Sequence, residues 1–181
     1  MNINLIKSGN NIPNDIYVII EISSNSNPIK YEINKETGAL FVDRFIPTAM
    51  FYPCNYGYIN NTLSSDGDSL DALVICNYPL LPLSVINCKP IGVLNMQDEH
   101  GNDSKIISVP SNKLSNEFNL INDIHDLNND LKMRIIHFFE HYKKLEKNKW
   151  TKINGLSDAN QAKIEIEYAC KNFKNKLHNN H

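Results

Sequence analysis

Hydrophobic and polar positions alternate in short runs over the first two-thirds of the chain, and this alternation predicts β-strands. In one run, Ile29, Tyr31 and Ile33 alternate with Lys30 and Glu32. Because alternate side chains of a strand share one face, Lys30 and Glu32 should lie side by side. Similar patterns predict strands at residues 15–22, 40–45, 56–59, 72–77, 90–96 and 106–109. Many short strands separated by turns indicate a small barrel.

The last third of the chain has helical periodicity instead. Apolar side chains recur at helical spacing from Leu131 to Leu145, and Asp126 upstream is a candidate helix cap. A second helix is predicted from Ser157 to about Asn175. Its buried candidates are Ile164, Tyr168 and Cys170. The polar residues 176–181 are expected to fray. Strands followed by helices predict an α+β fold.

The composition is that of an ordinary globular protein. The length of 181 residues favours a single domain, residues 1–181. A formal net charge of −2 argues against a protein that binds nucleic acid by neutralising its phosphates. No apolar stretch approaches the roughly 20 residues of a membrane span, and the first residues lack the apolar region of a secretory signal. We therefore expect a cytoplasmic protein with no membrane partner. The four cysteines are scattered singly, which indicates reduced thiols and no zinc site.

The sharpest chemical signal is the segment DGDSLD between two predicted strands. Asp66, Asp68 and Asp71 bring three carboxylates into six residues, and these repel one another unless a cation holds them. Divalent cations that prefer oxygen ligands do this. An EF-hand does not fit, because Leu70 stands at its fifth position and Asn77 at its twelfth. A solvated acidic turn is the alternative.

A second acidic group, DEHGNDSK, follows a predicted strand. Gly101 and Asn102 mark a turn that would bring Asp98 and Asp103 close together. Acidic hairpin tips are common, so this group alone says little. If the two acidic groups meet at one end of a barrel, however, they would form a site for several cations.

A site that handles phosphate also needs cations and hydrogen-bond donors for the anionic oxygens. The candidates are Lys30, Arg44, Lys143, Lys144, Tyr52, Tyr56, Tyr58 and Tyr142. Each of them could instead be an ordinary surface charge or a packing residue. His137 and His141 share a helix face, but HFFEH lacks the HExxH pattern of a metalloprotease. An interface or surface role is expected for this pair.

Three segments carry a resemblance to a known family: FYPCNYGYI, the DGDSLD that follows it, and the later HFFEHYK. Through them the chain resembles the soluble family I inorganic pyrophosphatases of the bacterial type. The resemblance runs from about residue 15 to about residue 174. The one departure in the family signature is Ser69, where proline is usual. The resemblance implies a five-stranded OB-like β-barrel with flanking C-terminal helices. It also implies Mg²⁺-dependent hydrolysis of pyrophosphate to two orthophosphates by direct attack of a metal-activated water, with several Mg²⁺ ions per site and no organic cofactor.

The resemblance also assigns roles to individual residues. Asp68 matches the residue that takes the proton from the attacking water. The metal positions are Asp66, Asp71, Asp98, Asp103 and Glu32. The substrate-binding positions are Lys30, Arg44, Tyr56, Tyr142 and Lys143, and the supporting positions are Glu21 and Lys105. Bacterial members of the family are homohexamers, so we expect His137 and His141 to lie in or beside a subunit interface.

Two other classes of protein stay open at this point. A nucleic-acid-binding barrel would need a basic groove with stacking aromatics, which the net charge and the acidic groups oppose. A phosphohydrolase acting on nucleotides would need an element that binds the base, and the sequence has no obvious one.

Overall fold

The computed structural model describes residues 3–179, and five of its strands form a closed ring. They are β1 (Ile16–Ile22), β4 (Asn55–Ile59), β5 (Asp71–Val74), β6 (Val85–Asp98) and β8 (Lys105–Pro110). Hydrogen bonding runs in the order β1, β4, β5, β8, β6 and returns from β6 to β1. β5 and β8 are parallel, and the other neighbours in the ring are antiparallel. The expected five-stranded barrel is confirmed.

The remaining strands extend or accompany this barrel. They are β2 (Ile29–Ile33), β3 (Leu40–Phe45), β7 (Gly101–Asn102) and β9 (Thr151–Ser157). β7 and β9 pair with β6, whereas β2 and β3 form a separate hairpin. Strand β9 was not predicted, because TKINGLS contains few apolar residues and Gly155 interrupts it. Its pairing with the long β6 makes it a strand.

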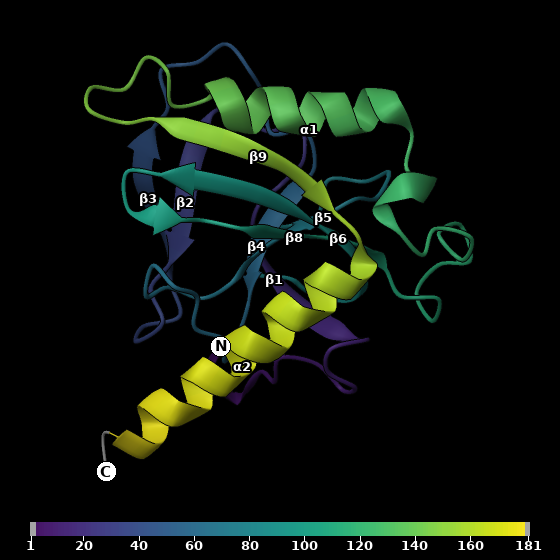
Figure 1. Ribbon diagram of the computed structural model, residues 1–181. Coiled ribbons are helices and arrows are strands. Elements are labelled where there is room, and N and C mark those ends of the chain that lie inside the picture. Colours follow the sequence, from purple (N-terminus) through teal and green to yellow (C-terminus); the bar gives the residue numbers. More distant parts are fainter. Residues whose placement is uncertain (1–2, 180–181) are drawn as a thin grey trace.

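Two long helices lie on different sides of the barrel (Figure 1). They are α1 (Asn129–His141) and α2 (Ala159–Asn179), and short 3₁₀ turns occupy η1 (Ile3–Leu5) and η2 (Ile124–Asp126). The main core lies between the barrel and α1, which buries Ile135, Phe138 and Phe139. A second core joins the barrel to α2. The expected α+β arrangement with C-terminal helices is confirmed.

The boundaries of α1 differ from the prediction. Its cap is Asn128, whose side chain accepts a hydrogen bond from the backbone N–H of Asp130. Asp126 belongs instead to the capping box of η2. The helix ends at His141, so Leu145 lies beyond it and is 76% exposed. The helical spacing of apolar residues continues to Leu145, beyond the end of α1, so the sequence pattern predicted too long a helix.

Helix α2 also corrects two expectations. Ile164 and Tyr168 are exposed, and the side chains packed on the barrel are Ala162, Ile166 and Ala169. The small Ala162 and Ala169 permit a close approach of the helix, with Ile166 between them on the contact face, whereas Ile164 and Tyr168 lie off that face. The helix continues through residues 176–179 of the expected frayed tail; residues 180 and 181 lie outside the described part.

The helices and the cysteines bear on two expectations drawn from the sequence. In the described part of the chain, no helix is both long and apolar enough to cross a membrane. Cys54, Cys76, Cys88 and Cys170 are all free thiols, as expected.

Candidate active site

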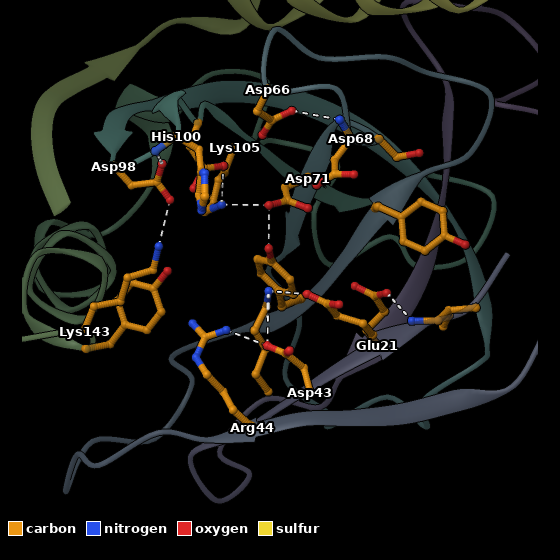
Figure 2. A pocket seen from close by; sticks show the side chains of 18 of the residues that line it. Glu21, Asp43, Arg44, Asp66, Asp68, Asp71, Asp98, His100, Lys105 and Lys143 are labelled. Carbon is orange, nitrogen blue, oxygen red and sulfur yellow. Dashed lines mark hydrogen bonds and ion pairs between the residues drawn. The ribbon is translucent and has the colours of Figure 1, made fainter. Parts of the chain in front are cut away.

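A cavity of about 440 Å³ opens between the barrel, the β2–β3 hairpin and the segment after α1. Every residue assigned above to a catalytic, substrate, metal or supporting position lines it. Figure 2 shows that acidic and basic side chains reach this space from several sides. The fold therefore brings the two acidic groups of the sequence together.

Lys105 lies at the centre of the acidic wall. Its Nζ donates to Asp71 Oδ2 at 2.7 Å and to Asp103 Oδ1 at 2.9 Å. The parallel pairing of β5 with β8 places Lys105 opposite Asp71. Burial alone would lower the pKa of Lys105, but the two carboxylates outweigh it and hold this pKa well above its ordinary value. The ammonium group is therefore charged and neutralises part of the wall.

Tyr56 adds a neutral donor to the same wall. Its hydroxyl donates to Asp71 Oδ2, and burial together with the nearby Asp71 charge raises the pKa of the phenol. The position of Tyr56 depends on Gly57, because a Cβ there would lie 1.9 Å from the carbonyl oxygen of Ile19 in β1. Glycine lets β4 approach β1 closely enough to direct Tyr56 at Asp71.

The second acidic group contributes Asp103 to the acidic wall and Asp98 to the side of the cavity that holds Lys143. β7 pairs back on the end of β6, so the predicted turn between Asp98 and Asp103 is confirmed. Asp98 Oδ2 accepts from Lys143 Nζ at 2.7 Å, and Oδ1 accepts from the His100 N–H at 2.8 Å. Burial would raise the pKa of Asp98, but these hydrogen bonds and the Lys143 charge lower it. Lys143 follows α1 rather than lying on it as predicted, and Tyr142 caps the helix.

Asp66 and Asp68 of DGDSLD lie on an open loop, residues 64–70, called the acidic loop below, whereas Asp71 begins β5. The backbone N–H of Asp68 donates to Asp66 Oδ1 at 3.0 Å, and Gly67 has a φ of +93°. Burial, with the charges of Asp68 and Asp71, raises the pKa of Asp66. Among the described residues, no Lys or Arg forms an ion pair with the Asp68 carboxylate.

The β2–β3 hairpin supplies cations from a third side. Lys30 pairs with Arg44 across the hairpin, and Lys30 Nζ contacts the Glu32 carboxylate, so the predicted shared face is confirmed. Arg44 Nη1 lies 2.5 Å from Asp43 Oδ2, and Arg44 Nε lies 2.8 Å from Glu146 Oε2. Both cations are therefore held at the edge of the cavity.

Glu21 joins the barrel to this hairpin. It lies on β1, is 7% exposed, and its Oε1 accepts from the Ile33 N–H at 2.8 Å. Burial, helped by the charges of Asp71 and Glu32, raises its pKa to about 8. A carboxylic acid with this pKa is largely protonated at neutral pH unless a cation binds nearby.

Sequence reasoning missed or misplaced several residues. The cavity is also lined by Lys35, Asp43, Glu99, His100 and Lys149, which had no assigned role, and by Tyr58, which the sequence offered as a candidate donor. Glu99 and His100 belong to a segment already singled out, but no local signal marks Lys149. Tyr52 does not line the cavity; its ring packs 4.7 Å from that of Phe138.

The side chains of the cavity suit oxygen-preferring divalent cations. Nine carboxylic acids and six lysines or arginines line it, which leaves an excess of negative charge. In the described part of the chain, no three acidic, histidine or cysteine side chains converge on one point as a finished metal cage. Mg²⁺ needs no such cage, because it commonly binds one or two carboxylates and keeps several waters.

Carboxylates interleaved with fixed cations at a barrel mouth are typical of enzymes that process phosphates with divalent metals. The sequence profile described as Inorganic pyrophosphatase matches residues 18–174. The chain belongs to the inorganic pyrophosphatase family, which implies a divalent metal cofactor.

Individual relatives support this assignment. An inorganic pyrophosphatase of Buchnera aphidicola subsp. Schizaphis graminum is 65% identical over 92% of this chain and 93% of its own. That of Escherichia coli strain K12 is 59% identical over 94% and 97%. The crystal structure of an inorganic phosphatase from Anaplasma phagocytophilum matches with a TM-score of 0.92 and 46% identity, over 93% and 99% of the two chains.

Proposed function

We propose that this protein hydrolyses inorganic pyrophosphate to two orthophosphates with Mg²⁺, by direct attack of an activated water. Family membership supports the reaction class. The cavity supports the substrate, because it combines cations for phosphate oxygens with an excess of carboxylates for metal ions. No organic cofactor is needed for this chemistry.

Lys30, Arg44 and Lys143 would bind the phosphate oxygens, with Tyr56 and Tyr142 as hydrogen-bond donors. Pyrophosphate carries three to four negative charges, so fixed cations at its oxygens favour both binding and the transition state. Each of the three cations now contacts a carboxylate, which holds it at the cavity edge.

The divalent ions would be held by five carboxylates, with Glu21 and Lys105 supporting them. These carboxylates belong to Asp66, Asp71, Asp98, Asp103 and Glu32. When bound, such ions lower the pKa of water and neutralise phosphate charge. Lys105 keeps Asp71 and Asp103 close together in spite of their repulsion. The carboxylate pair is therefore prearranged for a cation.

Asp68 would accept the proton from the attacking water, and one observation carries this assignment. Asp71, Asp98 and Asp103 are each paired with an ammonium group, and Asp66 accepts a backbone hydrogen bond, whereas the Asp68 carboxylate forms no ion pair in the described residues. A carboxylate that no cation holds is available to accept a hydrogen bond from a bound water, which a general base requires. Its place beside Asp66 on the acidic loop puts it at the same cavity.

The test is phosphate release from pyrophosphate, ATP and a phosphomonoester, each with and without Mg²⁺. Asp68→Asn keeps the side-chain shape and should lower kcat roughly 100-fold or more. Asp71→Asn should instead raise the Mg²⁺ concentration needed for activity. Asp158→Asn is the control, because Asn also caps helices well and Asp158 caps α2 away from the cavity. Wild-type turnover in Asp68→Asn would contradict the mechanism.

We further propose that the protein is a cytoplasmic homohexamer. Free thiols suit a reducing compartment. An apolar groove beside α1, lined by Met133, Ile136 and Leu156 among others, offers a surface for a second copy. Light scattering tests the assembly, and fractionation tests the location.

A further inference from the structure

Lys35 lines the cavity but has no part in the reaction described so far. It follows β2, and its Nζ donates to Ser69 Oγ at 2.6 Å. The same ammonium lies 5.4 Å from the centre of the Tyr58 ring, and Tyr58 is 4% exposed. Lys35 thus rests on a buried aromatic ring and reaches from the hairpin to the acidic loop.

Ser69 stands where the acidic loop returns to the barrel. Its Oγ lies 3.5 Å from the carbonyl oxygen of Thr62, while Thr62 Oγ1 accepts from the Leu70 N–H at 2.9 Å. The hydroxyl can therefore accept from Lys35 and donate to Thr62 at the same time. This arrangement connects the hairpin to the base of the loop.

The tip of the acidic loop is held mainly by hydrogen bonds within the loop itself. A Cβ on Gly67 would meet no atom within 4 Å. Within the loop, two backbone hydrogen bonds join Ser64 to Asp68 at 2.8 Å and Gly67 to Ser64 at 3.2 Å, and one side-chain bond joins Asp66 to Asp68. The Ser65 hydroxyl also donates to the Asn102 carbonyl oxygen at 3.3 Å. Serine does not restrict its own backbone, whereas a proline at residue 69 would fix φ near −65°.

We infer that Lys35 is a positioning residue, which holds the acidic loop through Ser69 and so fixes where Asp66 and Asp68 face the cavity. The contact takes the place of the backbone restraint that the proline usual in the family signature would impose. This inference rests on the proposed function, since it assigns Asp66 and Asp68 the roles given above.

The experiment compares Lys35→Met in two backgrounds, the natural Ser69 and Ser69→Pro. With Ser69, Lys35→Met should raise the half-saturating Mg²⁺ concentration and lower kcat by roughly three- to tenfold, as expected for one charged hydrogen bond. With Ser69→Pro, which breaks no backbone hydrogen bond among the described residues, Lys35→Met should change either value less than about twofold. Lys35→Arg should retain near-natural values, and Lys171→Met on the exposed side of α2 is the matched control.

Metal binding without substrate separates this inference from the proposed function. Titration calorimetry with Mn²⁺ should show weaker binding for Lys35→Met and Ser69→Ala, and the double variant should be no weaker than either. Should Ser69→Pro fail to fold, this cycle decides the matter. The inference would be overturned if Lys35→Met had equal effects on kcat and on the half-saturating Mg²⁺ concentration with Ser69 and with Ser69→Pro. It would also be overturned if the losses of Mn²⁺ affinity in Lys35→Met and Ser69→Ala added up in the double variant, or if these variants lowered the Tm without changing Mn²⁺ binding. If the natural enzyme released no phosphate from pyrophosphate, the proposed function would be refuted. The Mn²⁺ binding measurements would still test whether Lys35 positions the acidic loop through Ser69.

Discussion

Two sides of the cavity differ in how deeply their charged side chains are buried. The barrel wall, made of Tyr56, Asp71, Asp103 and Lys105, is mostly buried, and its polar groups bond to one another. The hairpin rim, made of Lys30, Glu32, Asp43 and Arg44, is more exposed, with the Glu32 side chain at 52% against 2% for Lys105.

This difference follows from the strands that carry each side. β5 and β8 are part of the closed ring, whereas β2 and β3 belong to a separate hairpin. In the buried wall the side chains are fixed in position, but a substitution that removes one charge leaves its former partner as an uncompensated buried charge. An exposed rim can adjust to a ligand at little cost in stability. We therefore expect substitutions in the wall to affect folding and those in the rim to affect substrate binding.

The largest effect should come from Lys105→Met, which removes the only cation between Asp71 and Asp103 in the described structure. Breaking a buried ion pair leaves uncompensated charge, so the metal-free free energy of unfolding should fall by about 3–5 kcal/mol. Urea unfolding with a chelator measures this loss, and Mg²⁺ should restore part of it. A loss below about 1 kcal/mol would contradict the contrast between wall and rim.

Glu21→Gln tests the buried side through pH. Because the pKa of Glu21 is about 8 in the fold and ordinarily 4.5, the folded chain binds a proton that the unfolded chain releases. The free energy of unfolding should therefore fall as pH rises from 4.5 to 8, by at most about 5 kcal/mol from this group. Metal-free unfolding at several pH values should show a shallower decline for Glu21→Gln. Parallel profiles for the two proteins would refute the assignment.

A smaller effect on stability is expected at the rim. Lys30→Met should leave the free energy of unfolding within about 1 kcal/mol, since the Lys30–Glu32 pair is exposed. The KM for pyrophosphate should rise roughly tenfold, because a fixed phosphate cation is lost. Steady-state kinetics beside urea unfolding separates the two quantities. Loss of stability with unchanged KM would reverse the contrast.

The outer face of α1 extends the comparison to titratable groups outside the cavity. The rings of His137 and His141 stack 4.5 Å apart, and His141 Nδ1 lies 3.9 Å from Glu140 Oε2. If the pair lies at a subunit interface, acidification would gather like charges there, because imidazoles gain charge in mild acid, and this would loosen the oligomer. Light scattering at pH 7.5 and 5.5 should show this change, and replacing both residues by Gln should weaken it. A monomer at both pH values would rule the interface out.

Local patterns account for much of the cavity. Alternation placed Lys30 and Glu32 on one face, and the Gly101–Asn102 turn placed Asp98 near Asp103. Both features depend on neighbours in the chain, which sequence periodicity and turn chemistry reveal directly. The same reasoning failed for β9 and for the end of α1, because pairing with β6 and the local backbone decided those boundaries.

Residue identity and local spacing specify which side chains carry charge and which short segments present them. Which of these charges meet depends on how the whole chain folds. Lys105 reaches Asp71 across 34 residues, and Lys143 reaches Asp98 across 45. Such contacts form when the ring closes and α1 docks on it, so no local pattern contains them. Lys35 and Ser69, also 34 residues apart, meet for the same reason: the barrel brings the hairpin and the acidic loop to one cavity.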